Sequence, residues 1–343
     1  MRNLVTIQKI EDILPIEGAD AIEKAKIKEW WVVIKKGEFR IGDLCMYFEI
    51  DSFLPVKPEY GFLLRGSSPK KMLVDGQEKE GIRLKTIKLR GQISQGIALP
   101  ITDSFKDVTI GTDITGQLEV LKYEPQIPAN LAGVVKGNFP SFIQKSDEER
   151  IQNCADLLVH QKESVVYIAS KLDGTSATYF RYKGEFGACS RNLELKESLG
   201  NTIWEMADKY NLKACIPEGF AVQGELVGEG INKNPLRIKG HKLFVFNIFN
   251  IKEFKYLDFD EMIFFCKENN LDVVPIIKSS VILDFTFEQL MELANQKSPL
   301  NPDVLQEGIV VRPINERNVL INGVVRRFSF KVISNDYLLK MEQ

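Results

Sequence analysis

A lysine follows a short apolar run in the stretch V-V-Y-I-A-S-K-L-D-G-T-S-A-T-Y-F, residues 165–180. The run Val165–Ile168 is β-branched or aromatic, which predicts a buried strand that reaches Lys171. Gly174 then permits a tight turn, and Ala177–Phe180 predicts a second strand. A lysine at the end of the first strand, just before the turn, has a buried stem and an amine that faces a cleft. We therefore predict that Lys171 is a nucleophile.

The amine of Lys171 must lose its proton before it can attack. The reference lysine pKa of about 10.4 leaves roughly one amine in a few thousand neutral at pH 7. Burial or a nearby cation must therefore depress this pKa. Asp173, two residues on, would raise the pKa, whereas a bound metal ion could reverse that effect. Taken alone, K-x-D-G also fits an ordinary surface turn with a charged lysine and aspartate.

Five polar residues and one aromatic residue later in the chain lie within or beside predicted strands. Arg191 and Asn192 follow the predicted strand Glu185–Ser190, Glu225 lies inside Phe220–Val227, Phe246 lies inside His241–Asn250, Glu307 precedes Ile309–Arg312, and Lys331 ends Val324–Phe330. A carboxylate such as Glu225 is costly to bury among apolar neighbours, and a ribose hydroxyl or metal-bound water would be a suitable partner. The guanidinium of Arg191 suits two phosphate oxygens, although an exposed ion pair would also explain it. The carboxylates available to a hard divalent cation are Asp173, Glu225 and Glu307.

Helical patterns surround these strands. Ser146 and Glu149 form a capping-box pattern, which predicts a helix over Ser146–Leu158. Amphipathic patterns predict further helices over Thr202–Tyr210, Asp258–Asn269 and Thr286–Asn295. Strands and helices therefore alternate through the second part of the chain.

The first 120 or so residues have a different pattern, with short β-rich runs separated by glycine and proline. Strands are predicted at Leu4–Ile10, Trp30–Ile34, Leu44–Ile50, Ile82–Leu89 and Ile93–Leu99, with a possible helical turn at Ala19–Lys28. Such spacing indicates a small barrel or sandwich. Trp30 and Trp31 are adjacent, so one should enter the core while the other could stack on a base.

One predicted strand of this region is basic. R-L-K-T-I-K-L-R contains Arg83, Lys85, Lys88 and Arg90 and no acid. On a barrel face these side chains would follow a phosphate backbone. The alternative is a solvated edge strand that its charges protect from aggregation.

Composition limits the classes of function. The chain of 343 residues has 44% hydrophobic and 27% charged residues, which is typical of a globular protein large enough for two domains. Its net charge of -2 argues against bulk electrostatic binding of nucleic acid, so any such site must be a local patch. Five scattered cysteines without C-x-x-C spacing predict reduced thiols, and only two histidines make a histidine-based mechanism improbable. No long apolar run or signal peptide is evident, so we expect a cytoplasmic protein.

Six short motifs occur in a fixed order along the chain. They are K-x-D-G at Lys171, S-R-N at Ser190–Asn192, G-E-L-V-G at Gly224–Gly228, F-V-F-N at Phe244–Asn247, E-G-I-V-V-R at Glu307–Arg312 and S-F-K at Ser329–Lys331. Together they resemble the covalent nucleotidyltransferase superfamily of polynucleotide ligases and RNA capping enzymes. The chain looks most like ATP-dependent RNA ligases that carry an OB-type module ahead of the catalytic domain.

The resemblance implies an α+β fold with two domains. An OB-type nucleic-acid-binding barrel would cover residues 1–122. A nucleotidyltransferase domain of antiparallel sheets flanked by helices would cover residues 123–343, with 123–145 as connector. DNA ligases and capping enzymes place an OB domain after the last motif lysine, whereas only a dozen residues follow Lys331 here. This order favours an RNA ligase.

The resemblance also implies roles for the motif residues. Lys171 would attack ATP and carry AMP, with Glu307 and Lys331 as further catalytic residues. The nucleotide would contact Lys171, Asp173, Gly174, Arg191, Asn192, Glu225, Phe246, Glu307 and Lys331, while Mg²⁺ or Mn²⁺ would be held by Asp173, Glu225 and Glu307. Two positions depart from the common pattern: Ser329 replaces the first lysine of K-x-K, and Ser176 replaces an arginine or asparagine.

The expected reaction joins an RNA 3′-hydroxyl end to a 5′-phosphate end. The partner would be RNA or a nicked RNA/DNA duplex, and the enzyme is expected to be a monomer. Two alternatives stay open at this point. A capping guanylyltransferase would use GTP, and a degenerate OB-containing protein would bind nucleic acid without reacting.

Overall fold

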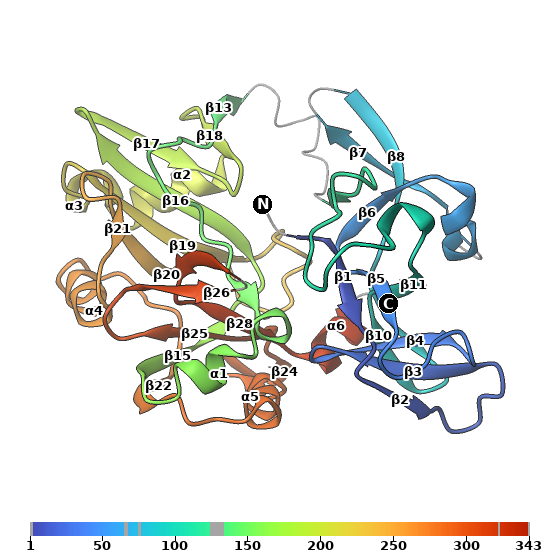
Figure 1. Ribbon diagram of the computed structural model, residues 1–343. Coiled ribbons are helices and arrows are strands. Elements are labelled where there is room, and N and C mark those ends of the chain that lie inside the picture. Colours follow the sequence, from blue (N-terminus) through green and yellow to red (C-terminus); the bar gives the residue numbers. More distant parts are fainter. Residues whose placement is uncertain (1–2, 65–67, 75–76, 124–133, 322, 342–343) are drawn as a thin grey trace. The chain divides into compact units, whose positions relative to one another are not determined.

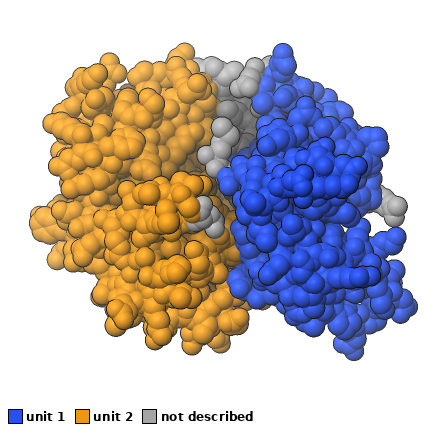
Figure 2. Space-filling view, viewed as in Figure 1, with its two compact units in different colours: residues 1–128, 338–343 blue, residues 129–337 orange. Residues whose placement is uncertain are grey.

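The computed structural model describes residues 3–64, 68–74, 77–123, 134–321 and 323–341. Part of the predicted connector, residues 124–133, lies outside the described residues. The chain forms two compact units, residues 1–128 with 338–343 and residues 129–337 (Figure 2). Each unit has its own hydrophobic core.

The first unit is built from short antiparallel strands (Figure 1). Its sheets have the orders β1 (Val5–Lys9), β5 (Leu44–Phe48), β11 (Ile97–Pro100); β2 (Asp12–Pro15), β3 (Ile22–Ile27), β4 (Trp30–Lys35); β12 (Leu121–Lys122), β6 (Ser52–Pro55), β8 (Gln77–Arg83), β7 (Lys70–Val74); and β9 (Thr86–Leu89), β10 (Gln92–Gln95). This unit also contains two 3-10 helices, Pro58–Leu64 and Asp103–Phe105, and the last turn of α6 (Asn335–Met341). Trp30 is fully buried and Trp31 half-buried, as the adjacent pair predicted.

The helical turn predicted at Ala19–Lys28 is wrong, because strand β3 occupies this segment. Ala25 and Ile27 enter the core and alternate with partly exposed lysines, which is the period of a strand. The predicted strands Ile82–Leu89 and Ile93–Leu99 are each divided in two. The second break falls at Gly96, which has a φ of 98° and no room for a Cβ.

The second unit contains two main sheets, with smaller pairs beside them (Figure 1). The seven-stranded sheet has the order β13 (Val135–Asn138), β18 (Leu193–Leu195), β17 (Glu185–Cys189), β16 (Thr175–Tyr182), β19 (Phe220–Gly228), β20 (His241–Asn250), β21 (Lys255–Tyr256). The five-stranded sheet has the order β14 (Glu149–Arg150), β28 (Phe330–Ile333), β25 (Gly308–Pro313), β15 (Val165–Lys171), β22 (Ile276–Ile282). The smaller pairs are β23 (Lys297–Ser298) with β24 (Asn301–Leu305) and β26 (Asn318–Ile321) with β27 (Val324–Arg327).

The chain passes from one main sheet to the other at the K-x-D-G motif. Strand β15 belongs to the five-stranded sheet and ends at Lys171. Strand β16 belongs to the seven-stranded sheet and begins at Thr175. The last three residues of the motif, Leu172, Asp173 and Gly174, therefore form the crossing between the sheets. This topology brings residues from both sheets to Lys171.

Three predicted helices are confirmed with their caps. They are α2 (Thr202–Lys209), capped by Asn201, α4 (Phe259–Glu268), capped by Asp258, and α5 (Phe287–Ala294), capped by Thr286. The other helices are α1 (Leu157–His160), α3 (Leu212–Cys215), α6 (Asn335–Met341) and a 3-10 turn at Ile151–Asn153. None of the helices in the described ranges is both long and apolar enough to span a membrane.

The helix predicted over Ser146–Leu158 is wrong. Its first half contains β14, which pairs in parallel with β28, and Arg150 lies opposite Lys331. The Ser146 hydroxyl donates to Glu148 and caps no helix. Ion pairs that tie Glu148 and Glu149 to distant arginines hold this segment extended, so tertiary contacts override the local signal.

Candidate active site

Lys171 and Glu307 lie side by side because their strands pair. Lys171 is opposite Gly308 in the register of β15 and β25, so Glu307 comes directly before that pair. The Lys171 Nζ lies 2.7 Å from both carboxylate oxygens of Glu307. The side chains retain 26% and 19% exposure, respectively. The Lys171 amine is therefore held in a largely buried site that remains partly accessible to solvent.

Glu225 approaches the same motif from the seven-stranded sheet. It lies opposite Ser176 in the pairing of β19 with β16, and its Oε1 accepts a 3.1 Å hydrogen bond from the Gly174 backbone N–H. A Cβ on Gly174 would overlap the carbonyl oxygen of Leu226. Glycine is therefore required for this close approach of backbone to backbone.

Asp173 is held by two residues that sequence reasoning missed. Asn232 donates a 2.9 Å hydrogen bond from Nδ2 to Asp173 Oδ1, and the Tyr337 hydroxyl donates to Asp173 Oδ2. Asn232 lies in a loop whose hydrophobic residues show no periodicity, and Tyr337 belongs to none of the six motifs. Neither residue carried a signal that sequence analysis could have used.

The carboxylates keep Lys171 protonated. Burial lowers the pKa of the Lys171 amine, but the nearby carboxylates, Glu307 foremost, outweigh burial and raise that pKa above its ordinary value. Burial raises the pKa of Glu225 to about 8, and the neighbouring carboxylates add to this rise against the effect of Lys171. Burial also raises the pKa of Glu307. Three carboxylates, those of Glu307, Glu225 and Asp173, thus act on Lys171, and they outnumber the amines of Lys171 and Lys331.

An added divalent cation fits this imbalance. Within the ranges that the structure covers, no group of three or more His, Cys, Asp or Glu side chains is arranged to hold a metal ion. Mg²⁺, however, usually keeps several waters and takes only one or two carboxylates together with substrate phosphates. The buried carboxylates of Glu225 and Glu307 match that donor set. A cation there would also lower the pKa of Lys171, which a nucleophile requires.

Lys331 and Arg191 share one counter-ion. The Lys331 Nζ lies 3.4 Å and the Arg191 Nη2 3.6 Å from the same Oδ1 of Asp147. Burial, reinforced by the charges of Arg150 and Lys171, lowers the pKa of Lys331 to about 8. Lys331 lies inside β28 instead of at the end of a longer strand, because the predicted strand Val324–Phe330 is divided into β27 and β28.

Asn192 lies beside Arg191 in the sequence, but its side chain is engaged elsewhere. The Asn192 Oδ1 accepts a 3.1 Å hydrogen bond from Lys145. Its backbone carbonyl accepts from the Phe139 N–H. The structure therefore ties Asn192 to the segment that precedes β14.

Phe246 lies at a break in the register of β19 and β20. Gln223 pairs with Asn247 and Gly224 pairs with Val245, so Phe246 is left over as a bulge residue. Bulges redirect side chains and are common beside active sites. The Phe246 backbone carbonyl accepts a 2.9 Å hydrogen bond from Arg312, whose guanidinium carbon lies 5.8 Å from the ring centroid.

Arg312 is the centre of a buried polar cluster that sequence reasoning also missed. Its side chain is 3% exposed and pairs at 2.6 Å with Glu148, which is 13% exposed. Burial opposes ionisation of Glu148, but Arg312 and the neighbouring cations hold the pKa of Glu148 well below its usual range. Arg312 also lies 3.3 Å from the Ser329 hydroxyl. The Arg312 cation therefore lies beside Ser329.

We expect Arg312→Met to lower the free energy of unfolding by about 3–5 kcal/mol, because it leaves Glu148 charged and buried without its partner. Urea denaturation at pH 7 measures this change. The double variant Arg312→Met, Glu148→Gln should recover part of the loss, because no buried charge remains. A loss below about 1 kcal/mol in the single variant would show that water compensates the carboxylate.

The four basic residues predicted to bind nucleic acid lie in the first unit but do not form one strand. Arg83 ends β8, pairs with Asp51 at 2.9 Å and lies over the Tyr123 ring at 4.7 Å. Lys85, Lys88 and Arg90 are exposed on and around β9. Arg83 is thus partly neutralised, while the other three cations face solvent.

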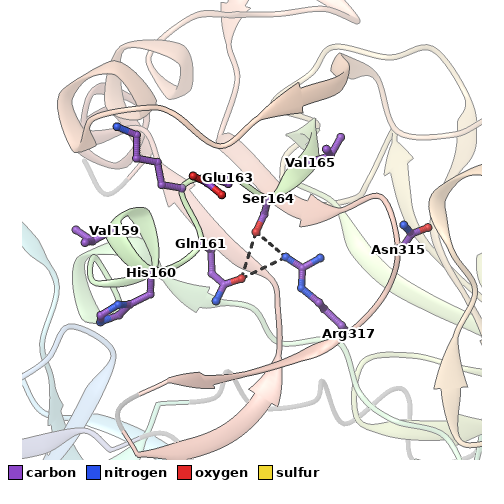
Figure 3. A pocket seen from close by; sticks show the side chains of 9 residues that line it. Val159, His160, Gln161, Glu163, Ser164, Val165, Asn315 and Arg317 are labelled. Atoms are coloured by element: carbon purple, nitrogen blue, oxygen red, sulfur yellow. Dashed lines mark hydrogen bonds between the residues drawn. The ribbon is translucent and has the colours of Figure 1, made fainter.

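Figure 3 shows a pocket of about 570 Å³ that is lined in part by Val165. Val165 is the first residue of β15, whereas Lys171 is its last. The pocket contains none of the predicted site residues. The Arg317 guanidinium donates to Gln161 at 3.2 Å and to Ser164 at 2.6 Å across its wall. Gln161, Ser164 and Arg317 therefore bond to one another, and the chemistry described above lies elsewhere.

Comparison with known proteins agrees with this geometry. A family model described as an OB-fold domain matches residues 4–101, and the RNA ligase model matches residues 164–333. A mutant Naegleria gruberi RNA ligase solved with ATP and Mn is 36% identical, with a TM-score of 0.86 and coverage of 98% of each chain. The same ligase solved with PPi is 37% identical, with a TM-score of 0.85 and coverage of 98% of each chain.

A search among curated proteins gave no match. The structural likeness nevertheless extends over nearly the whole chain, and it confirms the predicted α+β fold with an OB-fold domain first. The chain belongs to the RNA ligase family.

Proposed function

We propose that this ATP-dependent RNA ligase stores AMP on Lys171 and seals nicks whose 3′-hydroxyl end is RNA. The observation that carries the proposal is the position of the Lys171 amine, which is fixed on Glu307 with Glu225 and Lys331 around it. The Naegleria gruberi RNA ligase of the same fold was solved in separate structures with ATP and Mn, with AMP and Mn, and with PPi. This supports a nucleotide site at the crossing between the two sheets.

In the first step the neutral amine of Lys171 attacks the α-phosphorus of ATP. A P–N bond forms, the P–O bond to pyrophosphate breaks and pyrophosphate leaves, and the nitrogen releases one proton to solvent. Lys331 neutralises charge on the α-phosphate, since phosphoryl transfer depends mainly on positioning and electrostatics. Phe246 stacks on the base, and Glu225 binds the ribose.

The second and third steps transfer AMP and then release it. An oxygen of the RNA 5′-phosphate attacks the lysyl-AMP phosphorus, which frees Lys171 and activates the 5′ end. The 3′-hydroxyl then attacks that 5′-phosphate and AMP leaves. Arg191 contacts a phosphate, and its present partner Asp147 is half-exposed, so the contact can be exchanged.

Glu307 and Glu225, with Asp173 beside them, would hold Mg²⁺ or Mn²⁺. The bound cation supplies charge neutralisation on phosphate oxygens. The residues of the chain hold the Lys171 amine in place, orient the nucleotide and restrict the access of water to the site. The exposed cations Lys85, Lys88 and Arg90, with Arg83, would contact nucleic acid in the first unit.

The proposal is tested with radiolabelled ATP and a divalent cation on a denaturing gel. The protein should become labelled by ATP and pass the label to the 5′ end of a nicked duplex. Sealing should be faster with RNA than with DNA at the 3′-hydroxyl end, and equal rates would contradict the nick preference. Labelling by GTP instead would indicate a capping guanylyltransferase, and no labelling would indicate a binding protein.

Lys331→Arg should change the pH profile of self-adenylylation. Below about pH 8 Lys331 is charged, so kcat/KM should rise about tenfold per pH unit as Lys171 loses its proton. Above that pH the loss of charge on Lys331 offsets the gain, and the profile should level. Arginine keeps its charge, so the rise should continue in the variant. A break at the same pH in both proteins would contradict this role.

A further inference from the structure

The loop between β19 and β20, residues 229–240, carries three cations that the proposed mechanism does not use. Its sequence, E-G-I-N-K-N-P-L-R-I-K-G, contains Lys233, Arg237 and Lys239 and a single acid, Glu229. All three cationic residues are exposed. Within the described part of the chain, none of the three forms a salt bridge. These three cations are therefore available to bind an anionic partner from solution.

The loop is attached to the nucleophile motif. The Asn232 Nδ2 donates at 2.9 Å to Asp173 Oδ1 and also donates to the Gly174 carbonyl. Lys233 directly follows Asn232, and consecutive Cα atoms are about 3.8 Å apart, so the Lys233 Cα lies close to the residue that makes this contact. The loop thus places exposed positive charge next to the turn that follows Lys171.

The shape of the loop is fixed before any partner arrives. The Asn234 side chain bonds to both backbone groups of Ile238, at 2.9 and 3.0 Å. Leu236 is 3% exposed in the main core of the unit, and its carbonyl accepts a 3.1 Å hydrogen bond from Asn301. The middle of the loop is therefore anchored to the rest of the unit, and the three cations are carried by a segment of defined structure.

Two of these cations have unusual backbone conformations. Lys233 and Arg237 have φ values of 62° and 54°, in the left-handed region, as do Asn232 and Asn234. Residues other than glycine adopt this region at a cost, and such strain persists only where surrounding contacts impose it. The contacts of the loop therefore impose these conformations on Lys233 and Arg237, which are both exposed.

We propose that residues 229–240 bind the phosphate backbone of the RNA substrate next to Lys171, through Lys233, Arg237 and Lys239. This inference rests on the proposed function. The cations of the nucleotide site, Lys171 and Lys331, are largely buried, whereas the loop cations are exposed on long side chains. Exposed lysine and arginine are the residues that contact phosphates of nucleic acid. With a net charge of -2, the chain requires such a local patch.

The test compares two triple variants. Lys233→Gln, Arg237→Gln, Lys239→Gln removes the loop charge, and Lys252→Gln, Lys267→Gln, Lys297→Gln removes the same charge from other exposed positions of the second unit. Three quantities are measured: labelling by ATP alone, sealing of a nicked RNA duplex, and binding of that duplex at several NaCl concentrations. Thermal melting checks that both variants fold, and Lys239→Gln alone avoids the left-handed positions.

The loop variant should label with ATP within about twofold of wild type, because its cations do not serve the nucleotide. It should bind RNA roughly 30-fold more weakly at low salt, and the slope of log K against log salt should fall by about 2–3. Sealing should fall in parallel, while the control variant behaves as wild type.

Equal RNA affinity and salt dependence in the two triple variants would overturn the inference. A raised KM for ATP with unchanged RNA binding would overturn it as well and would assign the loop to the triphosphate of ATP. If wild type never labels, the proposed function fails, but RNA binding still reports on the loop. The two failures are therefore distinguishable.

Discussion

Lys171→Ala should abolish self-adenylylation and the sealing of 5′-phosphate RNA, with a loss of roughly 10⁴-fold or more, as is typical when a covalent nucleophile is removed. No other described amine lies against Glu307 in this site. The loss should affect labelling and sealing equally, because both need the lysyl-AMP intermediate.

An RNA end that already carries AMP separates this role from a structural one. The first two steps are then complete, so Lys171→Ala should seal such an end far better than it seals a 5′-phosphate end. Lys252→Ala, at an exposed position, serves as the matched control and should behave as wild type. Labelling of the Lys171→Ala protein by ATP would contradict the assignment of the nucleophile.

Glu307→Gln should slow self-adenylylation by about 10²–10³-fold, because the buried carboxylate would no longer hold the divalent cation. A role as counter-ion alone predicts the opposite sign. Glu307 is the carboxylate that most raises the pKa of Lys171, so its neutralisation alone would make the amine a better nucleophile at pH 7. The measured direction therefore decides which effect of Glu307 prevails.

The concentration of metal ion provides the diagnostic measurement. If Glu307 holds the cation, added Mn²⁺ should partly restore the rate of Glu307→Gln, and the apparent metal affinity should fall. Glu268→Gln, at the exposed end of α4, is the matched control and should need no extra metal. A faster variant, or one whose loss is independent of metal, would restrict Glu307 to the role of counter-ion.

Much of the site followed from residue type and motif order. The run that precedes Lys171 is a buried strand, and Glu307 comes before the strand that pairs with it. Helices α2, α4 and α5 were predictable because each carries its capping residue in the local sequence. These features depend on neighbours within a few positions, which sequence patterns report well.

Contacts between distant segments were not predictable in the same way. Residues 146–158 have a helical signal, but pairing with β28 and the Glu148–Arg312 ion pair keep their first half extended. The bulge at Phe246 arises from the register of two strands. The Asn232 contact to Asp173 joins residues 59 positions apart, from a loop without periodicity.

The most direct test of the account is the mass of the purified protein after incubation with ATP and Mg²⁺ or Mn²⁺. We expect a gain of one adenylyl group, located by peptide mapping on Lys171 and removed when pyrophosphate or 5′-phosphate RNA is added. An unchanged mass, or an adenylyl group on any other residue, would contradict the central claim that Lys171 carries AMP.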